Sequence, residues 1–192
     1  MRIAVHVFEG AEELDWVGPW EVLTYWAAQR DDVEVVTVTD RPGPVRCAKG
    51  LRVLSDHTWD DLGDIDVLVY PGGKGTRGHL GVAAIRERVR GFHADGTLIM
   101  SVCTGSLVLA DAGLLDGRPA TTHWRAMDLL AELGTDIATR PDDRFVDDGD
   151  LITAAGVSAG IDAALHLVAR LASPEEARHV RRGIEYDPEP PV

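Results

Sequence analysis

The sequence predicts an α/β protein with a doubly wound, mostly parallel sheet sandwiched by helices, in the flavodoxin-like manner. Short apolar runs alternate with longer stretches of helical periodicity along the chain. Two of these runs end abruptly, one at the glycine-rich segment 71–78 and one at Cys103, which is typical of strands that lead directly into helices. The length of 192 residues and a hydrophobic content of 45% suit one domain over residues 1–192.

Strands are expected where β-branched and other apolar residues cluster, and helices where apolar residues recur at helical spacing. The expected strands are 3–8, 33–39, 66–70 and 97–102, with a hairpin over 45–54 and short strands within 136–155 around an acidic turn. The expected helices are 19–28, 77–93, 106–115, 124–133, 161–171 and 174–183. Because helices separate the main strands, we expect a parallel sheet that is covered on both faces.

Charge and composition exclude several classes of partner. The chain has 19 Lys and Arg against 32 Asp and Glu, a net charge of −13 that repels phosphate backbones and anionic lipids. We therefore expect no nucleic-acid and no membrane partner. The apolar stretch 98–115 contains polar residues and glycines, which fit strand–turn–helix better than a membrane span. The first residues are typical of a strand and show no signal peptide, so we expect a cytoplasmic protein. Its expected partner is a small-molecule substrate.

The cysteines and histidines do not predict a metal site. Cys47 and Cys103 are too few for a disulfide scaffold and lack the pairing of a zinc site, and the seven histidines show no metal-ligand spacing. Cys47 lies in the hairpin region without an acid–base partner, which favours a structural role. Neither a metal nor an organic cofactor is expected.

Cys103 stands where a strand gives way to a helix, the layout of a nucleophile elbow. Amides at the start of a helix favour negative charge, so this position predicts a lowered thiol pKa. The same amides, notably that of Thr104, could hold an anion that develops on a substrate. The alternative is a buried structural cysteine, a common fate of free thiols.

Asp15 lies between the first strand and the first expected helix, in a loop that parallel topology would bring to the same sheet edge as Cys103. It could cap that helix. It could instead carry a proton for Cys103, because burial beside a thiolate raises the pKa of a carboxyl group. Glu12, Glu13 and Glu21 are nearby alternatives that spacing alone does not separate from Asp15.

The glycine-rich segment 72–78 satisfies the G-x-G-x-x-G pattern after a strand, yet it does not fit nucleotide binding. The following strand ends without the acidic residue that would bind a ribose, and Lys74 is followed by glycine rather than Ser or Thr. The better interpretation is close approach of the backbone to a small ligand, with the amide of Gly73 completing an anion hole beside Thr104. A plain turn is the alternative.

Three further side chains are candidates for a substrate pocket. Trp16 and Trp20 flank Asp15 in the sequence and could wall such a pocket, although core or interface packing is the usual role of tryptophan. His123 could approach the site from the segment 120–124, or it could be structural.

Seven segments, in order along nearly the whole chain, resemble the DJ-1/PfpI superfamily, whose fold is similar to the class I glutamine amidotransferase domain. They are LDxxGPxEV at 14–22, PGGxG at 71–75, SVCTGSL at 101–107, AGLLxG at 112–117, ATTHW at 120–124, ITAAGVSAGID at 152–162 and EYxPxPP at 185–191. Within the superfamily the segments are most similar to those of isonitrile hydratases. Sensor domains of AraC-type regulators share the Cys-Thr-Gly and Thr-His-Trp segments.

The resemblance implies a DJ-1-like homodimer with Cys103 as the reactive thiol and a carboxyl group beside it. Many members have glutamate at the carboxyl position, whereas this sequence has Asp15, as hydratases do. It further implies a lyase in which Cys103 attacks an isonitrile to give a thioimidate, while Asp15, protonated at rest, donates a proton and later helps to activate water. The alternatives are a redox or ligand sensor and a glyoxalase-like activity on small dicarbonyls.

Overall fold

The computed structural model describes residues 1–188, and its centre is a seven-stranded sheet. The strands are β1 (Arg2–His6), β2 (Glu34–Thr39), β5 (His57–Thr58), β6 (Val67–Tyr70), β7 (Leu98–Val102), β10 (Phe145–Asp147) and β11 (Leu151–Ala154). Their order is β10-β11-β7-β6-β1-β2-β5, and every neighbouring pair is parallel except β10 with β11. The predicted mostly parallel, doubly wound sheet is therefore confirmed.

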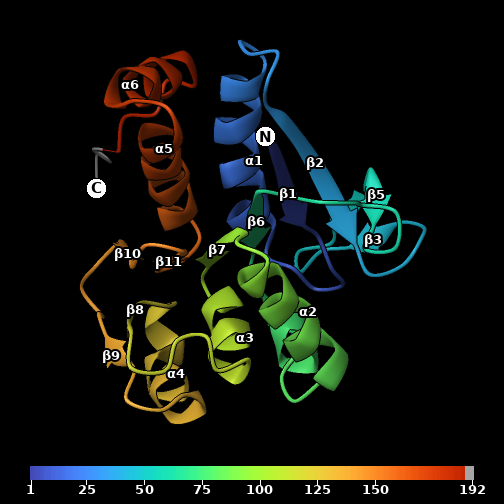
Figure 1. The fold of residues 1–192 in the computed structure, drawn as a ribbon, viewed down its shortest axis with the longest axis vertical. Coiled ribbons are helices and arrows are strands. Elements are labelled where there is room, and N and C mark those ends of the chain that lie inside the picture. The colour runs from blue at the N-terminus through green and yellow to red at the C-terminus, as the bar shows by residue number, and fades with distance from the viewer. Residues whose placement is uncertain (189–192) are drawn as a thin grey trace.

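The helices cover the two faces of this sheet. They are α1 (Glu13–Ala27), α2 (Ala83–Ala94), α3 (Gly105–Asp111), α4 (Met127–Leu133), α5 (Ala159–Leu171) and α6 (Pro174–Gly183). Figure 1 shows α1, α5 and α6 together on one side and α2, α3 and α4 on the other, and the helices of each group contact one another. With both faces covered, the central strands β6, β7 and β11 are almost entirely buried, which explains their continuous apolar runs.

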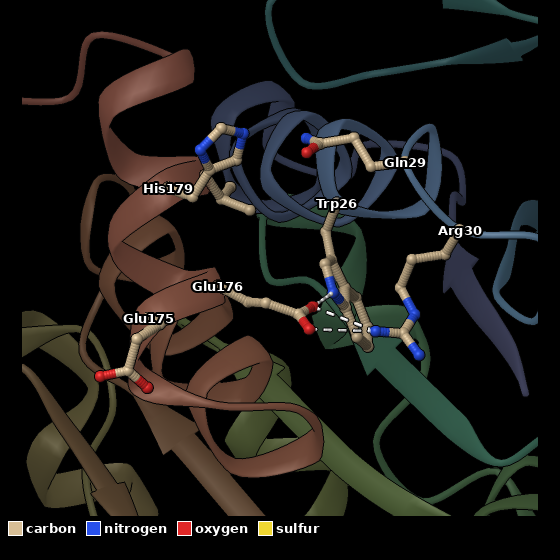
Figure 2. Close-up of a pocket in the computed structure, with 7 residues that line it drawn as sticks. Trp26, Gln29, Arg30, Glu175, Glu176 and His179 are labelled. Carbon is tan, nitrogen blue, oxygen red and sulfur yellow. Dashed lines mark hydrogen bonds and ion pairs between the residues drawn. The ribbon is translucent and has the colours of Figure 1, made fainter.

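Polar contacts link α6 to the end of α1 and the residues that follow it. The carboxylate of Glu176 accepts hydrogen bonds from Nε1 of Trp26 at 2.6 Å and from Nη1 of Arg30 at 3.1 Å, as Figure 2 shows. These groups line a cavity of about 420 Å³ together with Gln29, which like Arg30 follows the end of α1, and with further residues of α6. Because the Glu176 carboxylate already accepts hydrogen bonds from Trp26 and Arg30, we interpret this cavity as a gap in the packing between the helices rather than as a binding site.

Two helix predictions need correction at their starts. The helix expected over 19–28 begins at Glu13, with Pro19 inside it, because burial of the residues before the proline extends the helix backwards. The helix expected over 77–93 is divided into a 3₁₀ turn, η1 (Lys74–Gly78), and α2.

Two further helices are shorter than expected. The helix predicted over 106–115 ends at Asp111, since Gly113 takes a φ of +74° that a helix cannot continue through. The helix predicted over 124–133 starts with the 3₁₀ turn η2 (Trp124–Ala126) before α4.

The hairpin expected over 45–54 is confirmed as β3 (Val45–Arg46) paired antiparallel with β4 (Arg52–Val53). The segment 136–155 contains β9 (Ala138–Thr139), which pairs with β8 (Pro119–Ala120), as well as β10 and β11. β11 is a core strand beside β7 rather than a minor one. No helix within residues 1–188 is long and apolar enough to cross a membrane. The prolines at 190 and 191 lie outside the described residues.

Candidate functional site

The carboxyl ends of three neighbouring strands bring the predicted site residues to one edge of the sheet. β1 leads into α1 and Asp15, β6 leads into Gly72 and Gly73, and β7 leads into Cys103. Strand order reverses at β1, since β2 lies on one side of it and β6 on the other, which is where open α/β sheets place their ligands. Parallel topology thus explains why residues far apart in the sequence meet here.

Cys103 has the strained backbone of a nucleophile elbow. Its φ is +55°, a left-handed conformation that costs a non-glycine residue about 1–3 kcal/mol. Its carbonyl accepts hydrogen bonds from Oγ1 of Thr122 at 2.9 Å and Oγ of Ser106 at 3.1 Å, which hold the turn. A Cβ on Gly105 would lie 2.3 Å from the carbonyl oxygen of Tyr70, so only glycine lets the helix start this close to β6. The turn leaves the Cys103 side chain 6% exposed at the sheet edge.

Asp15 is fully buried in the first turn of α1, and its carboxylate is held from two sides. Oδ2 accepts a hydrogen bond from the amide of Gly72 at 3.0 Å, and Oδ1 accepts one from the amide of Val157 at 3.1 Å. The thiol of Cys103 is a further hydrogen-bonding neighbour. Burial outweighs these donors and raises the pKa of Asp15 to about 6. The structure thus brings the predicted cysteine and carboxyl group together, and places Asp15 on a helix rather than in a loop.

The pKa of Cys103 is raised to about 12, first by burial and then by the charge of Asp15. The predicted lowering is therefore wrong in direction. The amide and hydroxyl of Thr104 do act to lower this pKa, as expected of a helix start, but they are outweighed. At neutral pH the sulfur therefore keeps its proton, rather than forming the thiolate expected from the sequence, whereas the predicted rise in the pKa of Asp15 has the right direction.

Thr104 and Gly73 share a small hydrogen-bond network beside the sulfur. The amide of Gly73 donates to Oγ1 of Thr104 at 3.0 Å, and Oγ1 of Thr76 donates to the same oxygen at 3.0 Å. The Gly73 amide is thus engaged with a hydroxyl, whereas the Thr104 amide faces the sulfur. A Cβ on Gly73 would lie 2.4 Å from the carbonyl oxygen of Gly10, so this glycine permits close approach of backbone to backbone. The Gly73 amide is thus not free to complete an anion hole, and an anion hole at the Thr104 amide stays a prediction.

A cavity of about 580 Å³ opens above the Cys103 thiol. It is lined by Glu12, Gly73, Lys74, Arg77, Cys103, Thr104, His123, Arg125, Ala126 and Val157. His123 is therefore part of the pocket, and its Nδ1 accepts a hydrogen bond from the amide of Arg125 at 3.2 Å. Burial and the charges of Arg125 and Arg77 lower the pKa of His123, which keeps its ring neutral.

Trp16 and Trp20 do not line this pocket, contrary to the sequence-based expectation. Trp16 is 6% exposed within the hydrophobic core, with its indole nitrogen near Cys47. Trp20 packs against the same core. Neighbours of Asp15 in the sequence point elsewhere because each step along a helix rotates the side chain by about 100°.

The sequence alone does not assign six of the lining residues to the pocket: Glu12, Lys74, Arg77, Arg125, Ala126 and Val157. In the sequence, Glu12 is only an alternative acid to Asp15. Lys74 and Arg77 lie in the glycine-rich segment that superficially fits nucleotide binding, so that segment is the available signal. Among residues 1–188, no three His, Cys, Asp or Glu side chains gather where they could hold a metal ion.

The fold and the site define an α/β sandwich with a buried cysteine–aspartate pair at a strand–helix elbow. The DJ-1/PfpI family model matches residues 1–170, and the chain belongs to this family.

Similar proteins include an enzyme and a transcriptional regulator. An isonitrile hydratase of Pseudomonas putida is 39% identical over 191 residues, covering 100% of this chain and 81% of the relative. The HTH-type transcriptional regulator CdhR of Pseudomonas aeruginosa is 37% identical over 139 residues, 72% of this chain and 40% of the regulator. A crystal structure of a ThiJ/PfpI family protein from Pseudomonas syringae matches with a TM-score of 0.89 and 35% identity, covering 100% of this chain and 77% of that one.

Proposed function

We propose that this protein hydrates organic isonitriles to N-substituted formamides through a covalent Cys103 adduct. One observation carries the proposal: the Cys103 thiol and the Asp15 carboxyl group lie within hydrogen-bonding reach of each other beside a cavity of about 580 Å³. A nucleophile with an adjacent proton carrier suits an addition that must deliver both a nucleophile and a proton to one carbon. The similarity to an isonitrile hydratase supports this choice of reaction.

In the first half of the reaction, the sulfur of Cys103 attacks the terminal carbon of R–N≡C. Asp15 accepts the thiol proton as the S–C bond forms and passes it to the same carbon, which gives the thioimidate R–N=CH–S–Cys103. The raised pKa of Asp15, about 6, fits a group that must both accept and release a proton near neutral pH. The raised pKa of the thiol means that proton transfer must accompany attack rather than precede it.

In the second half, Asp15 takes a proton from water as the hydroxyl group adds to the thioimidate carbon, and the nitrogen receives that proton. The resulting R–NH–CH(OH)–S–Cys103 collapses when its hydroxyl proton returns to sulfur through Asp15. The C–S bond breaks, and R–NH–CHO leaves. The amide of Thr104 at the sulfur stabilises the negative charge that forms there on departure. One water is consumed and the enzyme is restored.

The test is turnover of cyclohexyl isonitrile by the purified protein, with N-cyclohexylformamide followed by mass spectrometry. We expect many turnovers per protein, and no cysteine-dependent product from Cys103→Ala. Cys47→Ala is the matched control, since Cys47 is the other free cysteine and is likewise buried. Full activity of Cys103→Ala would refute the covalent mechanism, and no formamide from wild type with several isonitriles would refute hydration itself.

The regulator relative supports ligand sensing as a second candidate. The same pocket would then bind a small molecule without converting it, and saturable binding without turnover would identify this role. Oxidation sensing is a weaker form of this candidate, because a thiol that is 6% exposed and has a raised pKa reacts slowly with peroxide.

A further inference from the structure

The pocket above Cys103 carries an unusual charge for this chain. The protein as a whole has a net charge of −13, yet three cations, Lys74, Arg77 and Arg125, line this one cavity. Glu12 is the one carboxylate among the lining residues, and Lys49 binds it. The balance of charge around the cavity is therefore positive.

These three cations have no acidic partner within the described residues 1–188, where other arginines such as Arg86 and Arg144 bind aspartates. Nη1 of Arg77 donates to Oγ1 of Thr76 at 3.2 Å, a neutral acceptor. The guanidinium of Arg125 lies 4.7 Å from the ring centroid of Trp124. Both arginines are thus held in place while their charges remain uncompensated.

The nucleophile and the positive charges lie at different depths in the pocket. Cys103 is 6% exposed at the floor, whereas Lys74, Arg77 and Arg125 are exposed side chains that line the same cavity. Arg77 comes from η1 and Arg125 from η2, and the charges of both act on His123, so the two turns converge there. A bound molecule would meet a nucleophile at one end and positive charge at the other.

We propose that the substrate is an isonitrile that carries a carboxylate or similar anion at the end remote from its reactive carbon. This inference rests on the proposed hydration for its reaction, and on the three cations for its substrate class. Guanidinium groups pair with carboxylates through charge-assisted hydrogen bonds, which are stronger than neutral ones. The anion must be remote, because the ionised Asp15 at the floor would repel a charge placed beside the sulfur.

The kinetic test compares 4-isocyanobenzoate with its methyl ester, which shares the reactive carbon and lacks the charge. We expect kcat/KM to be about tenfold higher for the acid, since one or two partly exposed charge pairs contribute roughly that factor. Arg77→Gln and Arg125→Gln should each reduce this preference severalfold, and 1 M KCl should reduce it in the wild type. Arg182→Gln removes the same charge from α6, outside the pocket, and should keep the preference.

A second readout does not depend on isonitrile chemistry. Alkylation of Cys103 by iodoacetamide at pH 8.5 is followed by peptide mass spectrometry in the presence of benzoate or benzamide. We expect benzoate to protect at a concentration several times lower than benzamide, and Arg77→Gln to remove the difference. Protection by benzoate without turnover of any isonitrile would uphold the anion site and refute hydration. Turnover of the neutral ester, with no preference for acid or benzoate, would uphold hydration and overturn the anion site.

Discussion

Replacing Asp15 with asparagine should make the Cys103 thiol more acidic and at the same time slow catalysis. Asparagine keeps the shape of the side chain and removes its charge. The charge of Asp15 is one of the causes that raise the pKa of Cys103, so this pKa should fall in the variant. Turnover should nevertheless decrease by about 10²- to 10⁴-fold, the usual effect of losing a positioned proton carrier.

The size of the effect on folding follows from the raised pKa of Asp15. An ordinary value of 3.8 in the unfolded chain and about 6 in the folded one means that the folded protein binds more protons between these pH values. Stability from this group is therefore lost as pH rises from about 4 to 6. Between pH 4.5 and 7.5 the loss is about 2 kcal/mol, and the whole shift corresponds to roughly 3 kcal/mol at most.

The Asp15→Asn substitution would remove this pH dependence and add a constant cost. The amide NH₂ of the new side chain must face either the Gly72 or the Val157 amide, both of which are donors to Asp15. A buried donor left without an acceptor costs about 1–3 kcal/mol. The variant should thus be less stable than wild type at pH 4.5 and should recover by about 2 kcal/mol relative to it at pH 7.5.

Urea unfolding of both proteins at pH 4.5 and 7.5 measures this difference, and iodoacetamide alkylation of Cys103 against pH measures the thiol. A stability difference that does not change with pH would show that Asp15 has an ordinary pKa. An unchanged alkylation profile would show that the carboxylate does not act on the thiol. Either result would refute the description of the site as a buried, coupled thiol–carboxyl pair.

Two other substitutions test the turn that holds the pair. Thr104→Val keeps the shape but leaves the amide of Gly73 without its acceptor, so we expect a loss of about 1–3 kcal/mol in unfolding free energy and a fall in turnover, while the hydroxyl of Thr76 keeps the Gly73 carbonyl as an acceptor. Gly105→Ala places a methyl group 2.3 Å from a backbone carbonyl oxygen and should destabilise the protein by about 1–3 kcal/mol or more, whereas Gly91→Ala, with open space in α2, should stabilise it by about 0.5–1 kcal/mol. Thermal and urea unfolding measure the stability of all three variants, and equal effects at the two glycines would contradict the packing argument.

Local signals predicted the position of Cys103, which is marked by an apolar run that stops at a strand–helix junction. They placed a carboxyl group after the first strand but did not separate Asp15 from Glu12, Glu13 and Glu21, and the choice of Asp15 came from the family resemblance. Parallel topology then requires both to reach one edge of the sheet, as they do. The sign of the Cys103 pKa shift was not predictable in the same way, because it depends on how deeply the pair is buried, and burial is a property of the finished packing.

The walls of the pocket were predicted poorly for a physical reason. The amide of Val157 reaches Asp15 across 142 residues, and Arg77 and Arg125 approach His123 from two separate 3₁₀ turns. Such contacts have no periodic signal in a single sequence. Proximity along the chain was misleading for Trp16, since the helix turns its side chain into the core.

The most direct test of covalent catalysis is intact-mass spectrometry of the protein quenched within one turnover of cyclohexyl isonitrile. We expect a species heavier by the mass of one isonitrile, located on Cys103 by peptide mapping, that forms and decays as N-cyclohexylformamide appears. This species should decay more slowly in Asp15→Asn, because Asp15 activates the water that removes it. Formamide production without any adduct, and at an unchanged rate in Cys103→Ala, would contradict covalent catalysis by this cysteine.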